Sequence, residues 1–96
     1  MIKERVFEEV KKIPKGETRT YKQLAIRCNI SQRAVARILS KNPSPIKIPC
    51  HRVIRSDGKP GGYTFKGKRN DKMKEKLLRE EGVEIKKGKI LNSKDF

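Results

Sequence analysis

A cysteine, a histidine and an arginine stand next to one another at positions 50–52, inside the stretch NPSPIKIPCHRVIRSDG of residues 42–58. An imidazole can take the proton that a thiol must lose to become a nucleophile, so Cys50 and His51 could form an activated pair. The positive charge of the chain is expected to lower the pKa of the Cys50 thiol. Because neighbours in an extended segment point to opposite sides, His51 would need a bridging water to reach that thiol. From residue types alone, Cys50 could equally be a small buried residue.

The second cysteine and the other metal-ligating residue types suggest no further site. Cys28 falls on the apolar face of an expected helix, so we interpret it as a core residue. Two cysteines and a single histidine without a paired spacing do not make a zinc site. We therefore predict no metal site.

The composition indicates one small, strongly basic domain over 1–96. Lysine and arginine number 26 against 11 acidic residues, and the formal net charge is +15. This charge indicates nucleic acid as the partner. The alternative is the charged surface of heat-adapted proteins, but those are rich in both lysine and glutamate, and glutamate is not correspondingly abundant here. The sequence has neither a transmembrane run nor a signal peptide, so we expect a cytoplasmic protein with reduced thiols and no membrane partner. We also expect a monomer.

The elements that must position these residues begin with a helix over 2–13 and a helix-turn-helix over about 20–40. Thr20 and Gln23 fit a capping box at the start of the motif's first helix. Asn29 is expected to end that helix in the left-handed conformation. The apolar positions of the first helix share one inward face and are Tyr21, Leu24, Ala25 and Cys28.

The second helix of the motif, over 32–40, is expected to begin at Ser31 and to have an apolar and a basic face. In a helix-turn-helix the second helix lies in a DNA groove, so Arg33 and Arg37, one turn apart, would project toward DNA. A helical hairpin with a solvated basic face is the alternative. The outer face consists of Gln32, Arg33, Ala36, Arg37 and Ser40.

Prolines dominate the next segment, which we take as an active-site loop over 42–54. Three prolines within seven residues favour backbone that is extended, stiff and not helical. The sequence then predicts a short strand over 51–54, a glycine-rich turn over 56–63, a basic loop over 65–70, a final helix over about 71–81 and a hairpin over about 83–91. The predicted fold class is mainly α with a small β element, a helix-turn-helix or winged-helix-like DNA-binding domain.

Several motifs together resemble one protein family. The stretch NPSPIKIPCHRVI, followed by GKPGGY and LLREEG, is similar to the O6-alkylguanine-DNA alkyltransferases, or methylated-DNA–protein-cysteine methyltransferases. GETRTYKQLA and QRAVARILSKNP match the family's helix-turn-helix region, and the similarity runs from about residue 7 to residue 82. The resemblance implies a DNA repair protein that flips a base of double-stranded DNA. It would move the alkyl group of O6-alkylguanine irreversibly to its own cysteine, once per molecule and without a cofactor.

The resemblance also implies catalytic roles for individual residues. Cys50 would be the alkyl acceptor and His51 the base that takes its proton through water, with Glu81 holding the imidazole in its working tautomer. Three further matches are Tyr21 as donor to the departing guanine, Lys74 as support for Cys50, and Asn42 as hinge between the recognition helix and the active-site loop. Taken singly, these three would be a core tyrosine, a surface lysine and a turn-forming asparagine.

Other positions are assigned by the resemblance to the base pocket or to DNA. The pocket would consist of Tyr63, Thr64, Pro49 and Ile54, and the DNA contacts of Arg33, Gln32, Arg37, Ala36, Tyr21 and Arg52. Arg33 matches the family's finger residue, which fills the gap that the flipped base leaves. For Arg52, a salt bridge near the site is an alternative to a phosphate contact.

The sequence departs from the family pattern in three respects. We expect only the C-terminal catalytic domain, without the family's usual N-terminal domain. Gln32 and Arg37 are larger than the residues usual on the recognition helix, which would alter the fit to the groove. Two extra residues lie between Tyr63 and Lys74, in a basic loop that would add phosphate contacts.

Two other functions stay open at this point. One is a lesion-binding protein like the alkyltransferase-like proteins, which bind alkylguanine without transfer and usually have tryptophan in place of the cysteine. The other is a helix-turn-helix regulator without chemistry.

Overall fold

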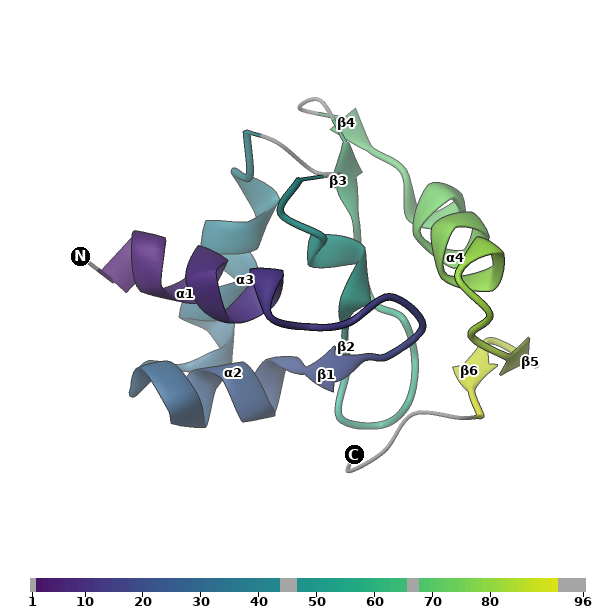
Figure 1. The fold of residues 1–96 in the computed structure, drawn as a ribbon, viewed down its shortest axis with the longest axis horizontal. Coiled ribbons are helices and arrows are strands. Elements are labelled where there is room, and N and C mark those ends of the chain that lie inside the picture. Colours follow the sequence, from purple (N-terminus) through teal and green to yellow (C-terminus); the bar gives the residue numbers. More distant parts are fainter. Residues whose placement is uncertain (1, 44–46, 66–67, 92–96) are drawn as a thin grey trace.

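A computed structural model of the protein describes residues 2–43, 47–65 and 68–91 (Figure 1). Within this part, four α-helices and three two-stranded sheets confirm the predicted mainly α class with a small β element. In chain order the elements are α1 (Ile2–Lys11), β1 (Arg19–Thr20), α2 (Tyr21–Cys28), α3 (Gln32–Ser40), the 3₁₀ helix η1 (Cys50–Arg52), β2 (Val53–Ile54), β3 (Thr64–Phe65), β4 (Lys68–Arg69), α4 (Asp71–Glu80), β5 (Ile85–Lys86) and β6 (Lys89–Ile90). No helix in the described ranges has the length and apolar character needed to cross a membrane.

Local capping defines the helix-turn-helix formed by α2 and α3. The Thr20 hydroxyl accepts a hydrogen bond from the Gln23 amide at 3.0 Å, and the Gln23 side chain accepts one from the Thr20 amide at 2.7 Å. Asn29 ends α2 in the left-handed region, at φ 57° and ψ 47°. The Ser31 hydroxyl accepts from the Ala34 amide at 3.0 Å and so begins α3. The predicted capping box, left-handed end and second cap are all confirmed.

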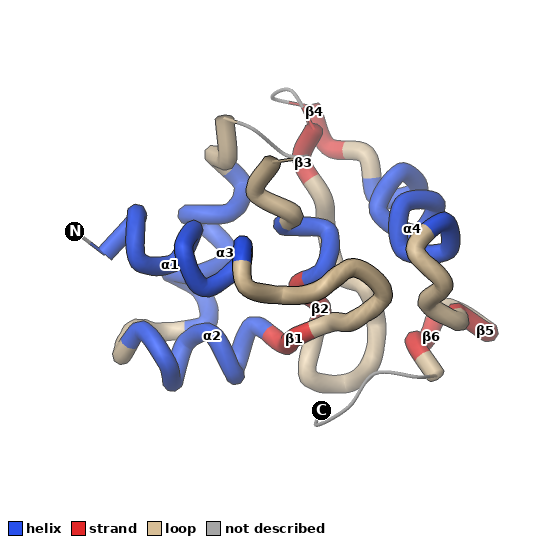
Figure 2. The backbone as a smooth tube through the Cα atoms, in the orientation of Figure 1, coloured by secondary structure: helices blue, strands red, loops and turns tan. Residues whose placement is uncertain are grey.

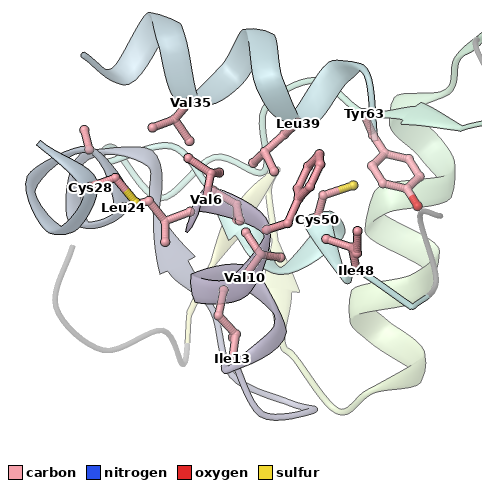
Figure 3. Close-up of a cluster of buried hydrophobic side chains, with 13 residues drawn as sticks. Val6, Val10, Ile13, Leu24, Cys28, Val35, Leu39, Ile48, Cys50 and Tyr63 are labelled. Carbon is pink, nitrogen blue, oxygen red and sulfur yellow. The ribbon is translucent and has the colours of Figure 1, made fainter. Parts of the chain in front are cut away.

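The first hydrophobic core lies where α1, α2 and α3 meet, and it reaches the segment that contains Cys50 (Figure 3). Val6, Val10 and Val35 have no exposed surface, and burying such side chains contributes roughly 1.5–3 kcal/mol each. Both cysteines belong to this core. The prediction that Cys28 is a buried helix residue is therefore confirmed.

A short parallel sheet connects the helix-turn-helix to the active-site loop. β1 pairs with β2, with Arg19 opposite Val53 and Thr20 opposite Ile54. The cap residue of α2 is thereby attached to the strand that follows η1, and Figure 2 shows these two strands side by side. Two residues are too few for an alternating pattern, so the sequence alone predicts no strand at β1.

The active-site loop differs from the prediction at its centre. Cys50–Arg52 form one turn of 3₁₀ helix instead of extended backbone. The Arg52 amide donates a hydrogen bond to the Pro49 carbonyl at 3.0 Å. Proline has no N–H to donate, but its carbonyl can still accept this bond. Of the predicted strand over 51–54, only Val53–Ile54 is extended. Residues 44–46 of the loop lie outside the described ranges.

The C-terminal part packs around a second small core. This core consists of Ile54, Leu78, Val83, Ile85 and Ile90. The predicted final helix and hairpin are confirmed as α4 and as β5 with β6, and the hairpin turns through Lys87 and Gly88 at φ 53° and 75°. The predicted loop over 65–70 is instead part of the antiparallel pair β3–β4, with Thr64 opposite Arg69. Residues 66–67 of that prediction lie outside the described ranges.

Candidate active site

Cys50 lines a cavity of about 280 Å³ at the junction of the helix-turn-helix and η1. Its side chain is only 4% exposed, and Figure 3 shows the sulfur directed toward Tyr63. The lining residues are Tyr21, Ala36, Leu39, Ser40, Cys50, Gly62 and Tyr63. A hollow of about 470 Å³ between α1 and α2 is larger, but its lining contains no thiol and includes the ion pair of Glu9 and Arg27 at 2.7 Å. Of these two cavities, the one at Cys50 is the one whose lining contains a thiol.

His51 and Glu81 form the hydrogen-bonded pair that the resemblance implied. The Nε2 atom of His51 lies 3.0 Å from Oε2 of Glu81. An ionised carboxylate can only accept, so Nε2 of the neutral ring carries the proton and Nδ1 has its lone pair free. Nδ1 is buried and has no hydrogen-bond partner in the described part of the chain. The imidazole is thus oriented to take a proton at Nδ1.

The protonation state of His51 agrees with a role as base. Burial lowers its pKa, although the Glu81 carboxylate opposes that shift, and the net pKa lies below the usual value. Burial raises the pKa of Glu81, but hydrogen bonds from Arg52 and His51 outweigh this effect and leave the pKa lowered. At neutral pH the pair therefore consists of a neutral imidazole and a carboxylate.

Arg52 fixes the position of Glu81. Its Nε and one terminal nitrogen donate to the two carboxylate oxygens of Glu81 at 2.9 and 2.7 Å, which is a bidentate ion pair. The other terminal nitrogen donates to the Ile13 carbonyl at 2.8 Å, two residues beyond the end of α1. The structure thus places Arg52 in the salt bridge that was the alternative to a phosphate contact. The phosphate contact stays a prediction.

The predicted effect of net charge on the Cys50 thiol was wrong. Burial raises the pKa of Cys50, and the opposing hydrogen bond from Asn42 and the charge of Lys74 only reduce that shift. Asn42 also donates from Nδ2 to the Ile48 carbonyl at 2.8 Å, so it joins the end of α3 to the segment before Cys50. The resting thiol is therefore neutral, and it needs a base to become a nucleophile.

Lys74 lies under the cavity with no exposed surface. Its ammonium group donates to the Gly62 carbonyl at 3.2 Å and to the Tyr21 hydroxyl at 3.4 Å. Burial lowers the pKa of Lys74 to about 7, against the opposing charges of Cys50 and Asp71. The surface location that its sequence pattern alone suggested is therefore wrong, because α4 turns this face toward the cavity.

Tyr21 and Tyr63 stand on the walls of the cavity. Burial first, and the negative charges of Cys50 and Asp71 after it, raise the pKa of Tyr21 to about 12, so this hydroxyl keeps its proton at neutral pH. Tyr63 is 4% exposed, and its ring meets the His51 ring edge to face at 6.5 Å between centroids. Tyr63 thereby connects the wall of the cavity to the base.

The other predicted pocket residues have different locations. Pro49 is buried directly before η1 and is not among the lining residues of the cavity. Ile54 is fully buried in the second core, so its placement in the pocket is corrected. Thr64 lies in β3, and its side chain is outside the described part. Sequence reasoning missed three lining residues, namely Leu39, Ser40 and Gly62.

The outer face of α3 lies beside this cavity. Gln32, Arg33 and Arg37 are exposed on it, as predicted. Ala36 and Ser40, on the same helix, line the cavity itself. A polyanion on the face of α3 would therefore come directly to the opening in front of Cys50.

Comparison with known proteins identifies the family of the chain. A family model described as 6-O-methylguanine DNA methyltransferase, DNA binding domain, matches residues 1–83. The chain belongs to this family. Among curated methyltransferase relatives, the methylated-DNA–protein-cysteine methyltransferase of Methanothermobacter thermautotrophicus is 49% identical over 84% of this chain and 44% of its own length. That of Saccharolobus solfataricus is 52% identical over 83% of the chain and 50% of its length. The chain thus spans about half the length of these methyltransferases.

Three of the solved structures that match have a similar fold. The O6-methylguanine-DNA methyltransferase of Pyrococcus kodakaraensis matches with a TM-score of 0.74 and 39% identity, over 84% of this chain and 46% of that one. Mycobacterium tuberculosis OGT in complex with DNA matches with a TM-score of 0.74 and 38% identity, over 82% and 48%. S. pombe Atl1, in complex with damaged DNA containing O6-carboxymethylguanine, matches with a TM-score of 0.76 and 28% identity, over 88% and 79%.

Proposed function

We propose that this protein repairs double-stranded DNA by transferring a methyl or other alkyl group from O6 of guanine to its own Cys50, irreversibly and once per molecule. The observation that carries the proposal is the position of a buried thiol in a cavity beside the exposed face of α3, above the pair of His51 and Glu81. About 50% identity to curated methyltransferases over most of the chain supports it.

The geometry supports a stepwise chemistry in which each proton is accounted for. His51 takes the proton of Cys50 at Nδ1, through a water molecule, and Glu81 stabilises the imidazolium that forms. The thiolate attacks the alkyl carbon, the carbon–oxygen bond breaks, and its electron pair stays on guanine. The Tyr21 hydroxyl donates a hydrogen bond to the guanine anion and keeps its own proton, and the proton held by His51 passes through water to the guanine. Because Lys74 already donates to the Tyr21 oxygen at 3.4 Å, the hydroxyl proton is directed elsewhere, toward the cavity.

Access to the thiol requires that guanine leave the DNA stack. O6 takes part in base pairing, so the alkyl carbon cannot meet a buried sulfur while the base is paired. Flipping costs a few kcal/mol, and a side chain inserted into the gap offsets part of this cost. Arg33, exposed on the face of α3 near the cavity, is the residue that we assign to this insertion.

Intact-mass spectrometry after mixing with a duplex that contains O6-methylguanine tests the proposal. The protein should gain the mass of one methyl group in place of one hydrogen, located on the peptide that contains Cys50. Cys50→Ser should gain nothing, and Cys28→Ser should react like the wild type because Cys28 is not among the residues that line the reactive cavity. Tight binding of the lesion without any mass gain would refute transfer.

Lesion binding without transfer is the second candidate, favoured by the TM-score of 0.76 to Atl1 bound to damaged DNA. The presence of Cys50 in the cavity favours transfer over this candidate. A regulator without chemistry would show neither the mass gain nor a preference for the lesion.

Arg33→Ala should reduce the preference for lesion-containing over unmodified duplex roughly 10-fold, because the flipped state loses the group that fills the gap. Fluorescence anisotropy with matched duplexes measures both affinities. Arg79→Ala is the control, since Arg79 is also exposed but lies on α4. It removes the same charge and should leave the preference unchanged. An equal loss of preference in both variants would contradict the assignment.

A further inference from the structure

The peptide bond between Gly62 and Tyr63, here called the 62–63 peptide, is held on both sides by α4. The Lys74 ammonium donates to its carbonyl oxygen at 3.2 Å. Its N–H donates to Oδ1 of Asp71 at 3.0 Å. The described chain has no cis peptide bonds, and in a trans peptide the C=O and N–H point in opposite directions. A cation and an anion, one turn apart on the same helix, therefore grip opposite sides of one peptide.

The 62–63 peptide is a wall of the reactive cavity. Gly62 and Tyr63 both line the cavity with Cys50. A third bond fixes the same place, because the Asn70 amide donates to the Tyr63 carbonyl at 2.7 Å. The Tyr63 ring in turn meets the ring of His51. The position of this peptide therefore determines both the width of the cavity and the surroundings of the base.

The backbone before the 62–63 peptide has little stiffness of its own. Gly61 and Gly62 are adjacent glycines, and Gly61 adopts φ 81°, a region open chiefly to glycine. Glycine gives the chain many alternative conformations, so a wall made from this segment needs outside contacts to keep one shape. The contacts from α4 supply that restraint.

We propose that Asp71 is a positioning residue of the alkyl-binding cavity, which acts together with Lys74 to clamp the 62–63 peptide in front of Cys50. The catalytic effect of this clamp rests on the proposed alkyl transfer, whereas the contacts that define the clamp do not depend on it. Asp71 touches no reacting atom. It acts through the peptide and, by its charge, through Lys74.

The charge of Asp71 gives the clamp a second effect. Asp71 raises the pKa of Lys74 against the larger, opposite effect of burial, and so helps the buried amine to keep its proton. The charge of Lys74 in turn lowers the pKa of Cys50. Removal of the Asp71 charge should therefore lower the pKa of Lys74 further and leave the buried amine neutral over a wider pH range.

Two substitutions separate the acceptor from the charge. Asp71→Ala removes both, whereas Asp71→Asn keeps an oxygen that can accept from the Tyr63 N–H and loses only the charge. Asp57→Asn is the control, because Asp57 is a solvent-accessible carboxylate paired with Arg55 at 3.0 Å. Thermal unfolding of each variant checks that the proteins compared are folded.

Three measurements test the clamp. First, NMR hydrogen exchange of the Tyr63 amide should be slow in the wild type and in Asp71→Asn, and about 10-fold faster in Asp71→Ala. Second, single-turnover transfer from the free base O6-benzylguanine should show a half-saturation concentration about 10-fold higher in Asp71→Ala, with Asp71→Asn near the wild type. Third, the pH midpoint of the Lys74 side chain, followed by NMR, should move downward in both Asp71 variants and not in Asp57→Asn.

The outcomes distinguish this inference from the proposed function. A Tyr63 amide that exchanges equally fast in the wild type and Asp71→Ala would overturn the clamp, and so would an Asp71→Asn variant as impaired as Asp71→Ala. An unchanged midpoint of Lys74 in both Asp71 variants would overturn the effect of charge. If the wild type transfers nothing from O6-benzylguanine or from alkylated DNA while the Tyr63 amide is protected, the proposed function fails and the clamp stands.

Discussion

Glu81→Gln should slow alkyl transfer about 10²–10⁴-fold, the range typical of a lost general base. The carboxylate of Glu81 can only accept from His51, at 3.0 Å, and so keeps the proton on Nε2 and the lone pair on Nδ1. A glutamine amide can also donate, which stabilises the opposite tautomer and removes the base from the side of Cys50. The neutral amide also stabilises the imidazolium less well. Single-turnover kinetics with a duplex that contains O6-methylguanine measures the loss.

The pH dependence of the same variant has a defined direction. Burial lowers the pKa of His51, and Glu81 raises it in opposition. The transfer rate should fall as the pH decreases through this pKa, because protonated His51 cannot accept a proton. Without the carboxylate the pKa of His51 lies lower still, so the acid limb of the rate profile should move to lower pH in Glu81→Gln. An acid limb that stays in place would show that the base is another group.

Glu80→Gln is the matched control for this prediction. Glu80 is the exposed neighbour of Glu81 at the end of α4, so its change alters the net charge equally without touching His51. We expect its transfer rate to equal that of the wild type. A similar loss in both variants would mean that the effect comes from weaker DNA binding or from the stability of α4.

The helix-turn-helix could be predicted residue by residue because its determinants are local. The Thr20 and Ser31 hydroxyls accept from amides three positions further on, and Asn29 ends α2 in the left-handed conformation, so each adopts the predicted role. The helical period of the apolar residues likewise predicts which faces are buried. The strands β1, β3 and β4 were missed because two residues are too few to show an alternating pattern. They are defined by their pairing, β1 with β2 and β3 with β4.

The catalytic relay could not be predicted from residue types, because tertiary packing brings its members together. Glu81 lies 30 positions from His51, and only the family resemblance indicated its role. Net charge predicted the wrong direction for the pKa of Cys50 because charge is spread over the chain, whereas burial acts on the thiol itself. The same reasoning explains Lys74, whose place under the cavity depends on how α4 packs.

Lys74→Met should change the stability of the protein in opposite directions at low and high pH. Burial lowers the pKa of Lys74 from 10.5 to about 7, and at about 1.36 kcal/mol per unit this charged amine costs on the order of 5 kcal/mol of folding free energy at pH values below 7. Met removes that cost but leaves the Gly62 carbonyl without its donor, a loss of about 1–3 kcal/mol. Below pH 7 the variant should therefore be more stable than the wild type.

The sign reverses as the pH rises, and this reversal identifies the buried amine as the cause. Between about pH 7 and pH 10.5 the unfolded chain binds a proton at Lys74 that the folded protein does not, so wild-type stability increases with pH. Above that window the neutral amine still donates to Gly62 and Tyr21, and the wild type should be the more stable protein.

Urea unfolding at several pH values measures the pH at which the two stabilities cross, with Lys76→Met, at an exposed position, as control. Below about pH 7, where Lys74 is charged, transfer should fall about 10-fold, because Cys50 loses the cation that lowers its pKa. Parallel stability curves for Lys74→Met and the wild type would show that Lys74 is not a buried, titrating amine.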